Sequence, residues 1–102
     1  MVQTTNPSER RECLIRKLGE TLPRLKGMVY PADYTTFSSA YEILKQNPSD
    51  KGYICKVLPP TVESLRGVVE TARLYRIPMR RKLMLETIDI LEEIVHSSTH
   101  LY

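Results

Sequence analysis

Apolar residues recur every three or four positions in four segments of the chain, and each segment begins at a proline. This spacing places the apolar side chains of a segment on one face of a helix. Proline suits the first turn of a helix, because the backbone N–H that it lacks would have no partner there. The four starting residues are Pro7, Pro31, Pro59 and Pro78. We therefore predict an all-α fold with four main helices.

The four helices are expected to pair as two tandem helical hairpins, residues 7–47 and 59–97, within a single domain that spans residues 1–102. Residues 48–58 lie between the hairpins. They begin with the turn-forming sequence Pro-Ser-Asp-Lys-Gly and continue with residues 53–58, half of which are aromatic or β-branched. Such a composition is typical of extended backbone. We therefore predict a short extended linker over residues 48–58.

The two predicted hairpins resemble each other when the chain is aligned on itself so that Pro31 falls on Pro78. Residues 41–44 (Tyr-Glu-Ile-Leu) then match residues 88–91 (Ile-Asp-Ile-Leu). One helical hairpin cannot bury its apolar face alone, whereas two stacked hairpins can. This alignment predicts a weak internal repeat. The alternative is a plain four-helix domain without internal symmetry.

The composition is that of an ordinary globular protein, with 102 residues of which 41% are hydrophobic and 26% are charged. The apolar runs are too short for a transmembrane helix. The N-terminus contains neither the basic region nor the apolar region of a secretory signal peptide. We therefore expect an intracellular protein that is not secreted and has no membrane partner. The net charge of +3 is also small for a protein that binds nucleic acid through charge alone.

The two cysteines, Cys13 and Cys55, lack the spacing of a paired-cysteine motif. We expect both to be buried, reduced thiols, and the alternative is a disulfide between them. A zinc site would need both cysteines together with His96 and His100, and this spacing matches no common zinc pattern. We therefore expect no metal site.

The length of the chain and its two-copy helical layout, centred on Pro31 and Pro78, resemble the small proteins of filamentous viruses that infect hyperthermophilic archaea, such as Acidianus filamentous virus 1. The low number of Asn and Gln residues, four in all, suits a hot habitat. The resemblance implies a viral protein located in the host cytoplasm or the virion, in which a disulfide between Cys13 and Cys55 would be less surprising. It carries over no diagnostic motif and no site residue.

Catalytic motifs are missing from the sequence. There is no glycine-rich phosphate loop, HExxH, GxSxG or paired-cysteine motif. Glu92, His96 and His100 fall at successive fourth positions and would share one helix face. An exposed Glu–His pair near a helix C-terminus is, however, usually only a solvated contact. We therefore predict that the protein is not an enzyme and uses no cofactor.

The densest charge cluster lies in residues 73–82, and no acid occurs between Glu70 and Glu86. Its cations are Arg73, Arg76, Arg80, Arg81 and Lys82. Cations in the first turn of a helix oppose the helix dipole and cost about 0.3–1 kcal/mol each. An unfavourable placement of charge that brings no evident gain in stability is typical of a functional region. This cluster could bind phosphates or an acidic peptide. The alternative is a solvated turn whose cations pair with nearby acids.

Tyrosine dominates the aromatic residues, with six Tyr, one Phe and no Trp. Tyrosine combines apolar area with a polar hydroxyl, so it suits half-exposed grooves as well as the edges of a core. Two stacked hairpins leave a crevice between them, in which an extended segment of a partner could lie. The alternative is that the rings close a small core.

We predict a non-enzymatic module that binds a protein or peptide segment in the crevice between the two hairpins. The expected binding residues are Tyr34, Tyr41, Tyr53, Tyr75, Arg76, Arg80 and Arg81. One alternative is a small basic nucleic-acid-binding protein that uses residues 73–82, with salt-sensitive binding and no base-specific readout. A second alternative is a structural subunit that assembles with itself, and a homodimer is its simplest form.

Overall fold

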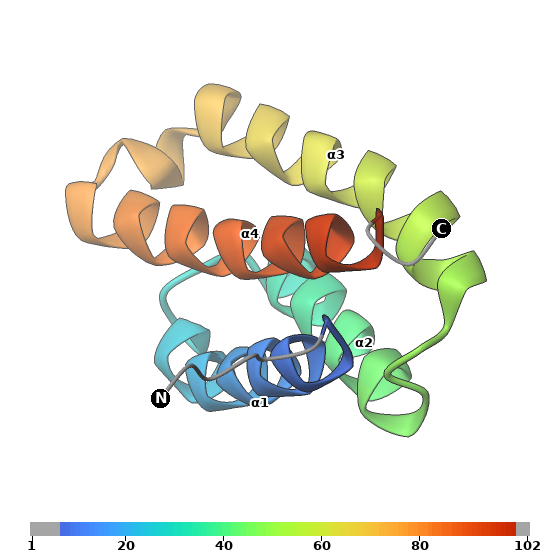
Figure 1. Ribbon diagram of the computed structural model, residues 1–102. Helices are drawn as coiled ribbons and strands as arrows, with labels where there is room; N and C mark the ends of the chain where they lie inside the picture. Colours follow the sequence, from blue (N-terminus) through green and yellow to red (C-terminus); the bar gives the residue numbers. More distant parts are fainter. Residues whose placement is uncertain (1–6, 100–102) are drawn as a thin grey trace, which may run out of the picture.

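The computed structural model describes residues 7–99, which form four α-helices and no strand. This confirms the predicted all-α fold (Figure 1). In chain order the elements are α1 (Pro7–Leu25), α2 (Pro31–Gln46), the π-helical turn η1 (Tyr53–Val57), α3 (Leu58–Thr71), the 3-10 turn η2 (Arg73–Arg76) and α4 (Pro78–Thr99). No helix in these residues is long and apolar enough to cross a membrane.

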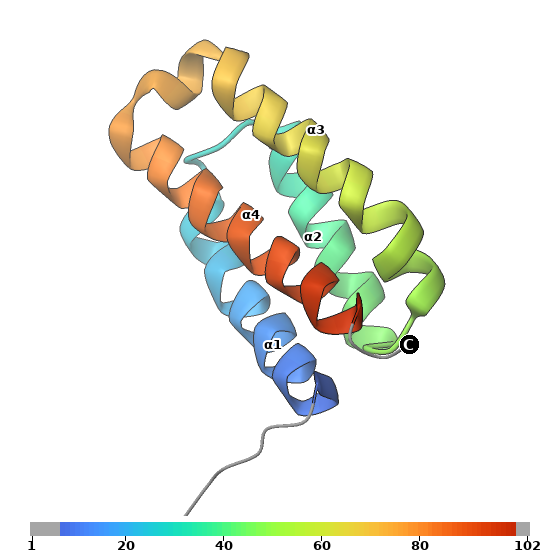
Figure 2. The same cartoon turned by 45° about the horizontal axis from the view of Figure 1, so that its top comes forward.

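The helices pack as two hairpins, α1 with α2 and α3 with α4, joined mainly through α1 and α4. Figure 2 shows α4 lying between α1 and α3. The second helix of each hairpin begins at a proline, Pro31 or Pro78, as the sequence predicts. The core is built from the apolar stripes of all four helices, and its fully buried side chains include Leu18, Leu25, Phe37, Leu44, Met84, Ile88, Leu91 and Ile94. Burying each such side chain contributes about 1.5–3 kcal/mol.

The predicted extended linker is wrong, because residues 53–57 form a π-helical turn that runs directly into α3. The turn begins where the Asp50 carboxylate accepts a hydrogen bond from the backbone N–H of Tyr53 at 3.1 Å. Ile54 and Leu58 then both point into the core, with 1% and 0% of their surfaces exposed. Residues four apart share a helix face, so burial of this pair outweighs the extended preference of the local composition.

The cysteines are free thiols, with Cys13 exposed and Cys55 half-buried. The expectation that both thiols are buried is therefore wrong, because Cys13 lies exposed on the outer face of α1 and Cys55 is only half-buried. Residues 7–99 contain no group of three or more His, Cys, Asp and Glu side chains arranged to hold a metal. His100, part of the zinc set considered from the sequence, lies outside the described residues.

Replacing Gly19 by Ala is expected to lower the free energy of unfolding by about 1–2 kcal/mol, as overpacking does. A Cβ at Gly19 would lie 2.6 Å from Cε1 and 2.8 Å from Oη of Tyr41, whose ring packs across α1. In an unobstructed helix the same replacement stabilises by about 1 kcal/mol. We therefore expect Gly19→Ala to become stabilising in the Tyr41→Ala background, as measured by urea unfolding. The same destabilisation in both backgrounds would contradict a steric contact with this ring.

Candidate functional site

One end of the bundle brings together the turn between α1 and α2, the η2 turn and the start of α4. Tyr75 joins these parts, because its Oη donates a hydrogen bond to Oδ2 of Asp33 at 2.5 Å and accepts one from the backbone N–H of Tyr30 at 3.0 Å. The rings of Tyr30 and Tyr75 also meet edge to face, with centroids 5.5 Å apart. Tyr75 has no exposed surface, and Asp33 is also buried. The Tyr75 hydroxyl therefore ties the second hairpin to the first.

The environment of Tyr75 keeps its hydroxyl protonated. Burial raises the pKa of this hydroxyl well above its usual range, and the hydrogen bond to Asp33 raises it further. Because a protonated hydroxyl can donate to a carboxylate, the same groups that raise the pKa maintain the bond. The hydroxyl of Tyr75 is consequently engaged within the protein at this end of the bundle.

Arg80 and Arg81, in the first turn of α4, bind the C-terminal ends of two other helices. Arg80 Nη1 donates to the backbone carbonyls of Gly27 at 3.3 Å and Met28 at 3.0 Å, just after α1. Arg81 Nη1 donates to the carbonyl of Val69 near the end of α3, at 3.4 Å. Because α4 runs antiparallel to α1 and α3, its first turn lies beside the negative ends of their dipoles. The carbonyl groups at these helix ends therefore offset the repulsion between the two arginines and the positive end of the α4 dipole.

The acids that follow along α4 are paired in the same antiparallel arrangement. Arg66 of α3 binds Asp89 at 3.1 Å and Glu92 at 2.6 Å. The outer face of α4 also carries two longer ion pairs to α1, Arg24–Glu86 and Arg10–Glu93, each at 3.6 Å. The cations at the start of α4 thus face the C-terminal ends of the two neighbouring helices, and its later acids face arginines of the same helices.

Three cations at this end have no ion-pair or hydrogen-bond partner within the described part of the chain: Arg73, Arg76 and Lys82. All three are exposed. Three large apolar side chains lie at the same end and are also exposed, namely Tyr30 (40%), Ile77 (47%) and Met79 (66%). We call these six residues the basic end. The acids on either side of the cluster in the sequence, Glu70 and Glu86, are already paired with Arg81 and Arg24, and the buried Asp33 accepts the hydrogen bond of Tyr75.

The structure does not gather the seven predicted binding residues into one site. Arg76 belongs to the basic end, whereas Tyr75 is buried and Arg80 and Arg81 hold backbone carbonyls. The remaining three tyrosines, Tyr34, Tyr41 and Tyr53, are half-buried and pack against the core.

The sequence prediction missed Tyr30, Ile77 and Met79 as members of the site. A signal for two of them was present, because Ile77 and Met79 flank Pro78 between two helical stripes and belong to neither stripe. Two further members, Arg73 and Lys82, were noted in the cation cluster but were not among the expected binding residues.

One groove between the hairpins, of about 350 Å³, lies between α2 and α3. It is lined by Asp33, Thr36, Pro60, Thr61, Ser64, Leu65 and Val68. None of the seven predicted binding residues lines this groove. None of them lines the groove of about 380 Å³ between α1 and α4 either. The structure therefore does not place these seven residues in a groove between the hairpins, and their role in binding stays a prediction.

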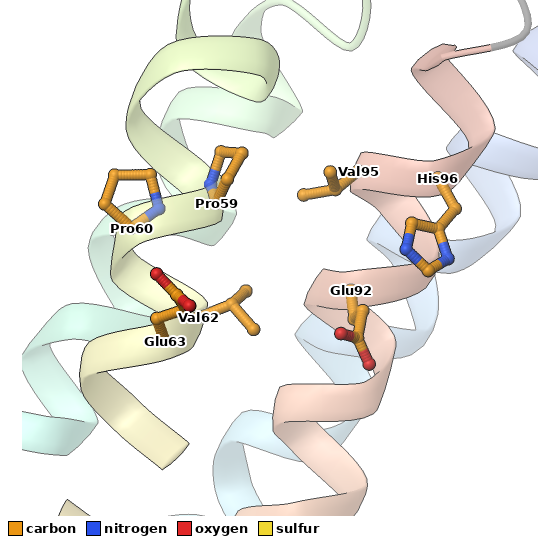
Figure 3. A pocket seen from close by; sticks show the side chains of 7 residues that line it. All are labelled: Pro59, Pro60, Val62, Glu63, Glu92, Val95 and His96. Carbon is orange, nitrogen blue, oxygen red and sulfur yellow. The ribbon is translucent and has the colours of Figure 1, made fainter. Parts of the chain in front are cut away.

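A second groove, of about 320 Å³, lies between the first turns of α3 and the last turns of α4 (Figure 3). We call it the acidic groove. Its lining residues are Pro59, Pro60, Val62, Glu63, Glu92, Val95 and His96. Figure 3 shows Val62 and Val95 pointing toward each other across the groove, with Glu92 and His96 one turn apart on α4.

Comparisons with models of protein families, with curated proteins and with solved structures gave no match. The resemblance to proteins of filamentous archaeal viruses therefore stays a prediction.

Proposed function

We propose that the protein is a non-enzymatic interaction module that binds an acidic, apolar segment of another protein on its basic end. The observation that supports this proposal is the coincidence of unpaired cations and exposed apolar side chains at one end of the bundle. Three of the five large apolar side chains that are exposed among residues 7–99 lie there. Apolar anchors surrounded by charge are the usual composition of a protein-binding patch.

The apolar side chains would supply most of the affinity. Met79 and Ile77 have about half or more of their surface exposed, so a partner that covers them removes apolar area from water. The cations would attract an acidic partner and set its orientation, which changes the association rate more than the affinity.

The surface is held in place before any partner arrives. Arg80 ties the start of α4 to the turn after α1, and Tyr75 ties η2 to α2. A preorganised surface loses less conformational entropy on binding. This internal bonding therefore favours recognition of a partner by the basic end.

Nucleic-acid binding by the same end is the second candidate, because phosphates also pair with arginine. Arg80 and Arg81 are engaged within the protein, so three of the five clustered cations remain available. Three phosphate contacts would limit the dependence of log K on log salt to a slope of about −2.7 for duplex DNA. Phosphate contacts would also leave Ile77 and Met79 exposed, which favours the protein partner.

A labelled acidic peptide with alternating Glu and Leu tests the proposal by fluorescence anisotropy. We expect binding that weakens at least about tenfold, or 1.4 kcal/mol, when Arg76→Glu and Met79→Ser are combined. Arg16→Glu, which reverses an exposed cation on the outer face of α1, is the matched control and should bind like the parent.

A duplex of about 30 base pairs serves as the competing probe in the same assay. Equal peptide binding by the parent and the Arg76→Glu, Met79→Ser variant would contradict the proposed surface. Tight duplex binding without peptide binding would instead favour the nucleic-acid candidate. Variants at Arg80 and Arg81 are unsuitable for this test, because they remove structural hydrogen bonds.

A further inference from the structure

The two ends of the bundle carry surfaces of complementary chemistry. The basic end presents Met79 and Ile77 together with unpaired cations. The acidic groove presents an apolar lining, which includes Val62 and Val95, between the carboxylates of Glu63 and Glu92. The two surfaces thus carry opposite charges, and each has apolar side chains that the other can cover.

The charge of the acidic groove is not cancelled within the described part of the chain. Glu63 is exposed and has no ion-pair partner there. Arg66 is shared between Asp89 and Glu92, so one guanidinium faces two carboxylates. The local excess is therefore negative, which favours a guest that carries lysine or arginine.

The two surfaces are far enough apart to be occupied at the same time. Met79 lies in the first turn of α4. Glu92 and His96 lie in its last two turns (Figure 3). At 1.5 Å per residue, the helix separates Met79 from Glu92 by about 20 Å. The longest dimension of the molecule is 44 Å, so a partner at one end leaves the other end open.

We infer that the basic end of one copy of the chain docks in the acidic groove of a second copy, head to tail. This inference rests on the proposed function, since it names the second copy as the partner of the basic end. Met79 and Ile77 would contact the apolar lining of the groove, while Arg76 would face Glu63. Because the two surfaces differ, the contact is heterologous, and each added copy exposes a new basic end or a new groove. Such contacts build open chains or rings rather than a symmetric dimer.

Light scattering coupled to size exclusion tests the inference with the full chain. We expect the mass of the parent to rise with concentration beyond that of a dimer, and to fall when salt is added. The end variant (Arg76→Glu, Met79→Ser) and the groove variant (Glu63→Lys) should each remain monomeric. Glu42→Lys, an exposed reversal on the outer face of α2, is the matched control and should assemble like the parent.

Mixing the two defective variants gives the decisive result. The end variant keeps an intact groove and the groove variant keeps an intact basic end, so the mixture should form a heterodimer and grow no further. A parent that stays monomeric, or a groove variant that assembles like the parent, would overturn the inference. A parent that stops at a dimer, with no complex in the mixture, would overturn it in favour of a symmetric contact.

The test also separates this inference from the proposed function. If the acidic peptide binds the basic end while the parent stays monomeric, head-to-tail assembly is wrong and the binding function stands. If the end variant loses neither peptide binding nor assembly, both are wrong. Unchanged thermal midpoints in each variant show that the substitutions act on the surface, since every altered residue is exposed.

Discussion

Replacing Tyr75 by Phe is expected to lower the free energy of unfolding by about 2–4 kcal/mol, because it leaves a buried carboxylate without its donor. Tyr75 Oη lies 2.5 Å from Oδ2 of Asp33 and also accepts the backbone N–H of Tyr30. The variant keeps the ring and its packing, so the decrease in the free energy of unfolding measures the contribution of the hydroxyl alone. Both broken bonds connect residues more than forty positions apart, and the docking of the two hairpins should therefore weaken.

Urea unfolding followed by circular dichroism measures this loss, with Tyr34→Phe as the matched control. Tyr34 is a half-buried tyrosine of α2, and its variant should stay within about 0.5 kcal/mol of the parent. In a double-mutant cycle with Asp33→Asn, the two effects should be strongly non-additive. Additive effects would mean that the hydroxyl and the carboxylate stabilise the fold separately.

The pH dependence of stability provides a second readout of Tyr75→Phe. The pKa of Tyr75 is raised in the folded protein above its usual value of 10.0, so the folded state retains its proton where the unfolded state has lost it. The associated stability is complete below about pH 10 and decreases as the pH rises further. The parent should lose stability above pH 10 more steeply than the variant. Tyr53, whose pKa burial also raises, remains in the variant and contributes the same direction of change in both proteins.

Replacing Arg11 by Ala is expected to lower the free energy of unfolding by about 2–4 kcal/mol, as for other large buried side chains. Arg11 has 2% of its surface exposed and lies on the inward face of α1. Its Nε donates to the carbonyl of Pro48 at 2.8 Å, and its Nη2 donates to Oγ of Ser49 at 3.2 Å. The alanine variant would lose both the volume of the side chain and the tether between α1 and the turn after α2.

Arg11→Met separates these two contributions. The Nη1 atom of Arg11 is buried and has no hydrogen-bond partner among the described residues, so the guanidinium is incompletely compensated for its loss of hydration. Methionine fills a similar volume without burying a charge. We expect it to stay within about 1 kcal/mol of the parent in thermal and urea unfolding. If Arg11→Met is as destabilising as Arg11→Ala, the stability at this position comes from the hydrogen bonds to Pro48 and Ser49 and not from the volume of the side chain.

The fold was largely predictable from local patterns, and the candidate site was not. Three of the four predicted helix starts are prolines that begin helices in the structure: Pro7, Pro31 and Pro78. A proline start and an apolar stripe both act within one helix, so the sequence reveals them directly. The third helical segment starts earlier than Pro59, because the burial of Ile54 and Leu58 extends it backward.

The four amphipathic helices and the cluster of cations around Pro78 can be read from the order of the residues alone. Which of those cations are available to a partner depends on how the helices pack. Arg80 and Arg81 reach the ends of α1 and α3, whereas Arg76 stays exposed beside Met79. Helix formation depends on neighbours within a turn or two of the chain. The partner of a charged side chain, in contrast, is set by antiparallel packing against a segment that can be more than fifty residues away, as Gly27 is from Arg80.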